Sequence, residues 1–319
     1  MEVVEGSAQP RKRVLGIALR VVLTAATFAF LFTRIPLREF QASLQRIPAA
    51  GILGCLVAFL AALCCNILRW RSLLQAYGAR ELPRLPALTR WYIVSMFYNL
   101  LPGAVGGDLL RGYATRHYFD DSAVSRSMGV VFVERVLGLA GLLILAALAS
   151  SFGPLRDRQV LIYSALGLCA AASAVAALAV GRRLERWLPA RIANIARTLP
   201  ALARPGGFAS ALSLAVVTHV LLALAGHAVI GALDANVRLG DSMVFFPVGT
   251  LAAYFPLSVA GAGARDTALV FLFARRGVSE SDALACSLTL LLIQLLVSGI
   301  GGFLHAPRTS SDSDAKAFS

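Results

Sequence analysis

The sequence predicts an all-α membrane protein, and three observations lead to that prediction. Hydrophobic residues make up 58% of the 319-residue chain and charged residues only 15%, whereas an average soluble domain has roughly 45–50% and 25%. Two apolar stretches are each interrupted by proline and glycine. Six others are long enough to cross a hydrocarbon core of about 30 Å: 14–33, 49–68, 128–150, 160–180, 209–233 and 283–304. We therefore expect six full transmembrane helices and two broken elements within one polytopic membrane domain over residues 14–304.

The two broken stretches, 91–113 and 243–273, each have a short apolar arm, a break and a second short arm. Neither arm alone spans a bilayer, and irregular backbone at membrane depth is tolerated only where protein buries it or where it lines a wet cavity. We interpret both as re-entrant broken-helix hairpins. An arrangement of eight helices, or hairpins that cross twice, remains open.

The basic residues favour an orientation with both termini in the cytoplasm. With the N-terminus inside, the cytoplasmic segments hold 19 Lys and Arg residues and the outside segments hold 9, as the positive-inside rule requires. Residues 1–13 form a basic cytoplasmic N-terminus, and residues 305–319 read as a disordered tail. The run 14–33 follows basic residues as in a signal peptide, but its length favours an uncleaved first helix. Trp70, Trp91 and Trp187 lie near predicted span ends, as interfacial aromatics do.

A formal net charge of +13 would suggest nucleic acid in a soluble protein. Here no basic module stands apart from the apolar runs, so we expect no nucleic-acid partner and assign the basic excess to loops beside anionic lipid. All five cysteines lie in apolar runs without disulfide or metal spacing, and we interpret them as packing residues. His219 and His227 share a span without further ligands, so hydrogen bonding within the bundle is the interpretation, with no metal or other cofactor.

The two breaks also match each other. Pro102, Val105 and Gly107 recur as Pro256, Val259 and Gly261 at an offset of 154 residues, and each break lies between two full spans. One span, 160–180, separates the two units. An odd number of crossings there inverts the second unit, so we expect an inverted repeat of about 49–150 and 209–304, the plan of many transporters.

The residues around the first break carry a family resemblance. Its pattern is filled by Phe97, Asn99, Pro102, Gly103, Gly106, Gly107, Asp108, Arg111, Glu134 and Arg135. A second pattern is filled by Pro256, Ser258, Gly261, Gly263 and Arg265, with Ala260 in place of glycine and Asp266 in place of glutamate. Over most of residues 14–304 the chain resembles the lysylphosphatidylglycerol-synthase transmembrane, or flippase-like (UPF0104), family.

That resemblance implies a stand-alone membrane domain without the synthase domain, in a bacterial inner membrane. The expected function is a lipid flippase or transporter for an anionic, phosphate-bearing headgroup, with membrane lipids as partners. The alternative is a non-transporting accessory subunit of a membrane lipid-modifying enzyme or glycosyltransferase. A third hypothesis is an intramembrane transferase with Asp108 and Glu134 as its only candidate carboxylates. No catalytic motif is present, so we expect no enzymatic activity.

The predicted headgroup site combines both breaks. It comprises Asn99, Pro102, Gly103, Gly106, Gly107, Asp108, Arg111, Glu134, Arg135, Pro256, Gly261, Gly263, Arg265 and Asp266. The glycines permit positive φ and close approach of a headgroup, and a helix beginning near Asp108, a plausible N-cap, offers free N–H groups to a phosphate. Arg111 and Arg265 each lie in a first helical turn, where the helix dipole opposes a cation unless an anion offsets it.

Two alternatives concern the charged residues of the first half. Arg111 either binds phosphate or pairs with Asp108 three residues away and extends to the cytoplasm. Glu134 and Arg135 are adjacent on a helix and diverge by about 100°, so each needs a partner elsewhere. Pairs between Arg135 and Asp108 and between Glu134 and Arg111 would make one buried network, which is either a ligand site or structural.

Overall fold

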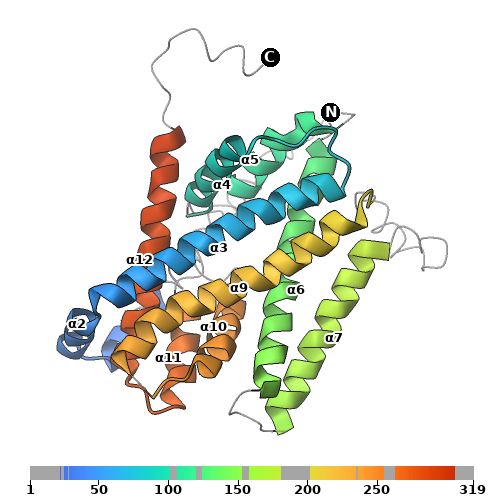
Figure 1. Ribbon diagram of the computed structural model, residues 1–319. Helices are drawn as coiled ribbons and strands as arrows, with labels where there is room; N and C mark the ends of the chain where they lie inside the picture. Colours follow the sequence, from blue (N-terminus) through green and yellow to red (C-terminus); the bar gives the residue numbers. More distant parts are fainter. Residues whose placement is uncertain are drawn as a thin grey trace, which may run out of the picture.

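The computed structural model describes residues 22, 25–27, 29–100, 106–119, 124–152, 158–180, 202–234, 236–254 and 263–305. These residues form helices and no strand, as the sequence predicts. The helices, labelled as in Figure 1, are α2 (Leu37–Arg46), α3 (Ala49–Ala76), α4 (Leu85–Leu100), α5 (Gly106–Thr115), the 3-10 helix η1 (Arg116–Tyr118), α6 (Val124–Phe152), α7 (Arg158–Val180), α9 (Pro205–Leu233), α10 (Leu239–Tyr254), α11 (Ala264–Ala274) and α12 (Glu280–His305).

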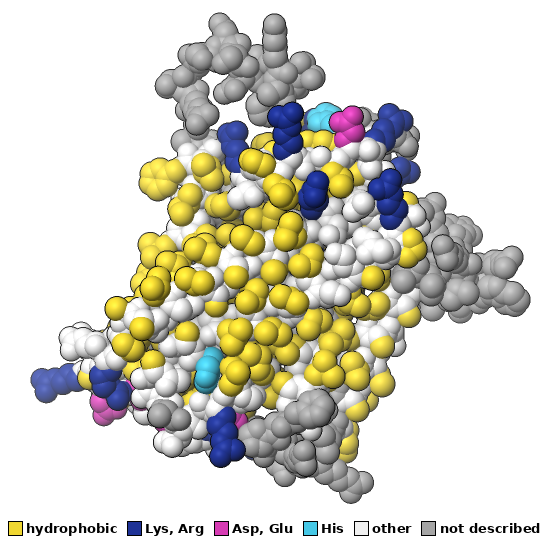
Figure 2. All heavy atoms as spheres, in the orientation of Figure 1, with side chains coloured by type: hydrophobic (Ala, Val, Ile, Leu, Met, Phe, Trp, Pro, Cys, Tyr) yellow, Lys and Arg dark blue, Asp and Glu magenta, His cyan; other side chains and the backbone are white. Residues whose placement is uncertain are grey.

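Four of these helices, α3, α6, α9 and α12, are long and apolar enough to cross a membrane. They coincide with four of the six predicted runs. The run at 160–180 is helical as α7, whereas most of the run at 14–33, the segment 1–13 and the tail beyond His305 lie outside the described residues. In Figure 2 a broad hydrophobic band separates two ends where Lys and Arg side chains gather. Length, composition and this surface define a multi-pass membrane protein.

The helices α3 and α9 lie side by side along much of their length (Figure 1). Their backbones approach closely near both ends of the contact, where one helix supplies a glycine. A Cβ added at Gly51 would lie 2.9 Å from the carbonyl oxygen of Ala228, and one at Gly207 would lie 2.9 Å from that of Ser72. Small residues allow such contact between helices in membranes, so α3 and α9 pack backbone to backbone near both ends of their contact.

The helix α3 is longer than the predicted run 49–68 because it continues to Ala76. Arg69 and Trp70 therefore lie within a buried helix face instead of a cytoplasmic loop. The prediction that Trp70 is an interfacial aromatic is wrong, since its side chain is fully buried. Trp91 is partly buried against the core, and Trp187 lies outside the described residues. Of the cysteines interpreted as packing residues, Cys64 and Cys169 are exposed, on faces that lipid would cover.

Both broken stretches contain two short helices around a break: α4 and α5 in the first, α10 and α11 in the second. Neither pair has a helix of spanning length. The breaks themselves, residues 101–105 and 255–262, lie outside the described residues, and with them Pro102, Gly103, Pro256 and Gly261. In Figure 1, α4 and α5 lie at the upper end of the bundle and α10 and α11 at the lower end.

Three connecting segments meet at one end of the bundle. The backbone N–H of Arg80 donates to the carbonyl of Tyr118 at 2.9 Å, and that of Ala203 donates to the carbonyl of Ala76 at 2.8 Å. The loops after α3, after α5 and before α9 are therefore on one side. The count of basic residues assigns these three loops to the cytoplasm.

This arrangement gives a labelling prediction. In a cysteine-free background, Glu81→Cys and Arg204→Cys should react with an impermeant maleimide from the same side of the membrane, and Asn236→Cys from the other. All three positions are exposed. If the basic count sets the orientation, the first two react only after the cells are opened. Labelling of Glu81→Cys and Asn236→Cys from the same side would contradict the topology.

Candidate functional site

Five charged side chains form a continuous chain of ion pairs between α3, α5 and α6. Within it, Glu134 accepts from Arg69 at 3.1 Å and from Arg111 at 2.6 Å. Arg111 also donates to Asp108 at 2.8 Å, and the second Asp108 oxygen accepts from Arg135 at 2.7 Å. The order is thus Arg69, Glu134, Arg111, Asp108, Arg135, with cation and anion alternating and a cation at each end.

The two ion pairs expected from the sequence, Glu134 with Arg111 and Arg135 with Asp108, are both present. The alternative contact of Arg111 with Asp108 is present as well. Arg111 nevertheless does not extend to the cytoplasm, because only 3% of its surface is exposed. Adjacent positions on α6 diverge, so Glu134 is buried between α3 and α5 while 52% of the Arg135 side chain remains exposed.

Aromatic rings hold the central arginine. The Arg111 guanidinium lies 5.3 Å from the ring centre of Trp70 and 4.9 Å from that of Tyr92. Cation–π contacts of this kind gain strength where water is excluded. Arg111 is therefore fixed by two rings and two carboxylates, and its position depends on α3, α4 and α6 together.

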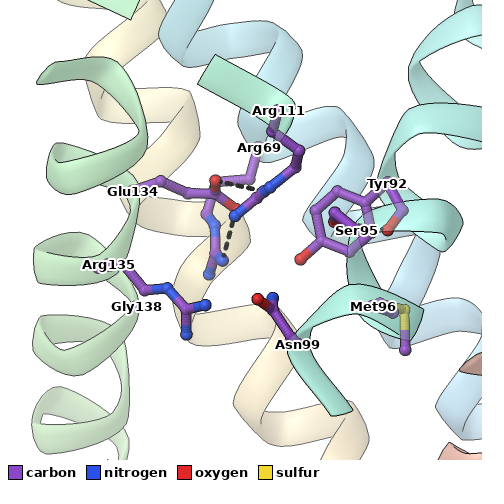
Figure 3. Close-up of a pocket in the computed structure, with 9 residues that line it drawn as sticks. All are labelled: Arg69, Tyr92, Ser95, Met96, Asn99, Arg111, Glu134, Arg135 and Gly138. Atoms are coloured by element: carbon purple, nitrogen blue, oxygen red, sulfur yellow. Dashed lines mark hydrogen bonds and ion pairs between the residues drawn. The ribbon is translucent and has the colours of Figure 1, made fainter. Parts of the chain in front are cut away.

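A small polar cavity lies beside this chain (Figure 3). Its volume is about 150 Å³, and Arg69, Tyr92, Ser95, Met96, Asn99, Arg111, Glu134, Arg135 and Gly138 line it. Among the described residues, the buried Nε atoms of Arg69 and Arg111 have no hydrogen-bond partner. Buried polar groups normally have one, so these two donors are left unsatisfied next to the cavity.

The site lies well inside the membrane helix. Glu134 is ten residues beyond the first residue of α6, Val124, which corresponds to about 15 Å at 1.5 Å per residue. The sequence placed it about 10 Å deep because the run was expected to begin at residue 128. A lone charge near the centre of a span costs roughly 2.5–3.5 kcal/mol on insertion scales, and the mutual pairing offsets this cost.

Gly107 and Asn99 have roles that differ from the sequence expectation. The position that a Cβ would take at Gly107 is 2.0 Å from the Ser95 carbonyl oxygen, so α4 covers the open face of this glycine and no headgroup approaches it there. Asn99 accepts a hydrogen bond from the Gly107 N–H at 3.2 Å. It thereby satisfies one of the free donors at the start of α5.

Asp108 is the third residue of α5 and does not precede it, so it is not the N-cap. Its carboxylate instead pairs with Arg111 and Arg135. Gly106 begins the helix, and the nearest atoms to a Cβ there would be 3.8 Å away. Neither Gly106 nor Gly107 has positive φ. Helical geometry thus replaces the loop conformation expected at these two positions.

The second break has a different arrangement. Gly263, at φ +91°, precedes α11, and its N–H donates to Asp266 at 2.8 Å. Asp266 also accepts from Arg265 at 3.2 Å and from the hydroxyl of Ser287. Arg265 thus pairs within its own helix and contacts α12. The sequence expectation that Arg265 lies beside Asp108, Glu134 and Arg135 is wrong, since α5 and α11 are at opposite ends of the bundle (Figure 1).

Both histidines bind other parts of the bundle. The Nε2 of His219 lies 2.9 Å from the carbonyl oxygen of Gly138, and the Nδ1 of His227 lies 3.0 Å from the Ser242 hydroxyl. Within the described ranges no group of three His, Cys, Asp or Glu residues could hold a metal ion. The histidines join α9 to α6 and α10.

Six residues of the site were not identified from the sequence: Arg69, Trp70, Tyr92, Ser95, Met96 and Gly138. Arg69 was assigned to a loop because the apolar run before it appears to end at residue 68. The signal that could have identified it is the helix length. If the helix continues beyond residue 68, the spacing of three and four residues places Asn66, Arg69 and Leu73 on one face. Arg69 and Leu73 are both buried on that face.

The fold and the site together define a polytopic helical membrane protein with an ion-pair network and a polar cavity inside its bundle. Residues 17–302 match the family described as the lysylphosphatidylglycerol synthase TM region. The chain therefore belongs to this family. No curated protein matches the sequence.

Proposed function

We propose that this protein is a lipid flippase or transporter for lipids with an anionic, phosphate-bearing headgroup. The observation that supports the proposal is the charged cavity inside the bundle. Three guanidinium groups and two carboxylates leave the cluster with a net charge of +1. Charged groups inside membrane helices are costly and line substrate paths more often than they serve packing alone.

The lining favours an anion over a cation. Arg69 and Arg111 line the cavity, and each has a buried Nε without a hydrogen-bond partner among the described residues; Arg135 is half-exposed at the edge of the cavity. The Glu134 carboxylate is fully engaged by two arginines, and Asp108 by two as well. Guanidinium groups bind phosphate oxygens in pairs. In this proposal the first break supplies the headgroup site, and Arg265 with Asp266 serves the second break as a structural pair.

The inverted repeat is part of the proposal, and the packing of the helices supports it. Exchanging α3 with α9, α4 with α10, α5 with α11 and α6 with α12 turns each packed pair among these eight helices into another packed pair. For example, α4 packs on α12 and α10 packs on α6. Such repeats place two broken elements at opposite membrane faces around a shared axis, so that each can open to one leaflet.

We place the protein in the bacterial inner membrane with both termini in the cytoplasm, because loops that meet at one end of the bundle carry the basic excess. Its partners in this proposal are anionic membrane lipids. The accessory-subunit alternative retains the same headgroup site but omits movement across the membrane. A transferase role is disfavoured, since Asp108 and Glu134 are both neutralised by arginines.

The test is lipid movement in vesicles that contain the purified protein and fluorescently labelled phosphatidylglycerol. Dithionite added outside destroys the label in the outer leaflet, so the fraction lost over time reports flipping, with and without an imposed proton or sodium gradient. We expect Arg135→Gln to slow flipping by about tenfold or more, because a charge-assisted contact is worth roughly 1.5–3 kcal/mol.

The matched control is Arg46→Gln, at the end of the bundle where α10 and α11 lie. Arg46 is also half-exposed, at 57%, and also pairs with one carboxylate, that of Asp282. It should leave flipping unchanged. Binding of phosphatidylglycerol without flipping under any gradient would favour the accessory subunit. Equal rates for wild type and Arg135→Gln would exclude the cavity as the transport site.

A further inference from the structure

The ion pair between Asp108 and Arg135 differs from the rest of the charged chain. The pairs of Glu134 are buried on both sides, with exposed fractions of 9% or less. Arg135 is 52% exposed and Asp108 14%. The Asp108–Arg135 pair is thus the least enclosed link of the chain, whereas both Glu134 pairs are closed off on all sides. This link is therefore the one that a ligand can replace at the lowest cost.

Asp108 keeps other partners if that link opens. Its first oxygen accepts from Arg111 at 2.8 Å, and its place in the first turn of α5 is favourable for an anion. Arg135, in contrast, has Asp108 as the ion-pair partner that the structure gives it. Its side chain points to the cavity that Asn99 and Tyr92 also face (Figure 3).

We propose that Asp108 is an internal competitor: the phosphate of the bound headgroup takes the place of the Asp108 carboxylate on Arg135, and Asp108 is not itself a headgroup ligand. This inference rests on the proposed anion site. It also sets the charge class of the ligand. The cluster carries +1, so a headgroup of net charge −1, such as a phosphodiester without an ammonium group, brings the buried assembly to neutrality. Residual charge in a dry site is costly.

The proposal makes Asp108→Asn a variant that binds anions more tightly. The amide preserves shape and still accepts a hydrogen bond from Arg111, but it no longer holds Arg135. We expect the dissociation constant for phosphatidylglycerol in nanodiscs with a phosphatidylcholine background to fall about two- to fivefold, the effect of removing one competing hydrogen bond. If Asp108 were a headgroup ligand, the same variant would bind more weakly.

The matched control is Asp282→Asn. Asp282 is also the third residue of its helix, is largely buried, and also pairs with a half-exposed arginine, Arg46, but far from the cavity. It adds the same unit of charge to the protein and should leave the affinity unchanged. An equal gain in this control would indicate a general charge effect and overturn the proposal.

A double-mutant cycle isolates the competition. In an Arg135→Gln background, Asp108→Asn should give no gain, because there is no arginine left to release. A gain that persists in this background would overturn the proposal, as would weaker binding by folded Asp108→Asn. Melting temperatures of all variants in detergent verify folding.

A competition experiment distinguishes recognition of the lipid from recognition of free phosphate. Inorganic phosphate added as a competitor should displace phosphatidylglycerol more readily from Asp108→Asn if the site recognises phosphate alone, and equally poorly from both proteins if the lipid is required. If the wild type binds phosphatidylglycerol and Asp108→Asn binds it no more tightly, this inference is wrong and the proposed function still stands. Absence of binding in both proteins would end both.

Discussion

Replacing Glu134 with glutamine is expected to lower the free energy of unfolding by about 3–5 kcal/mol, the usual cost of removing one partner of a buried ion pair. The substitution keeps the size of the side chain. It leaves Arg69 and Arg111, both less than 10% exposed, without a full counter-charge in a low-dielectric interior. Thermal unfolding of the purified protein in detergent measures the effect as a loss of melting temperature.

The neighbouring Arg135→Gln is the control for this experiment. It removes a charge one residue away on the same helix, but that side chain is half-exposed and, among the described residues, pairs with Asp108, so we expect a smaller loss of melting temperature than for Glu134→Gln. A second variant tests the cause. Adding Arg69→Gln to Glu134→Gln should restore part of the melting temperature, because it removes one uncompensated cation. Equal melting temperatures for the two single variants would show that burial does not govern the network.

Gly107→Ala is expected to disrupt the site by moving α5 away from α4. The added Cβ would lie 2.0 Å from the Ser95 carbonyl oxygen and 2.6 Å from Asn99 Oδ1. The first of these atoms is backbone and cannot rotate aside. Overpacking typically costs 1–3 kcal/mol and occasionally more. Since α5 carries Asp108 and Arg111, we also expect a large loss of lipid flipping.

Gly106→Ala is the matched control, one residue earlier in the same helix. The nearest described atom to its Cβ would be the Tyr98 carbonyl oxygen at 3.8 Å, and alanine is favoured over glycine in helices by about 0.5–1 kcal/mol. The melting temperature should therefore stay or rise slightly, and flipping should persist. If both alanine variants have the same melting temperature and flipping rate, the close contact of α5 with α4 is not required for stability or transport.

The fold class followed from the sequence because hydrophobic length is a local property. A run such as 209–233 is long and apolar regardless of its neighbours, and the helix α9 coincides with it. The end of α3 did not follow, because Arg69 in a loop and Arg69 in a buried helix face look alike until Glu134 is placed opposite. Long-range pairing of this kind is not encoded in a window of residues.

The candidate site was predictable in part for the same reason. The divergence of Glu134 and Arg135 on one helix implied partners elsewhere, and Asp108 and Arg111 of the first break were the charges expected to supply them. Arg265 was grouped with them by motif position alone. Asp266 beside it supplies a local counter-charge, so Arg265 needs no distant partner. Motif position thus identified similar residues but not their shared location.

The contact of α3 with α9 has a mechanical consequence. The backbones of α3 and α9 are in close contact near both ends, at Gly51 and Gly207. Because close-packed interiors have low compressibility, the two helices have little room to slide or tilt against each other. The short helices α5 and α11 are held by fewer neighbours. If the protein transports lipid as proposed, we therefore expect α3 and α9 to stay fixed relative to each other while α5 and α11 move.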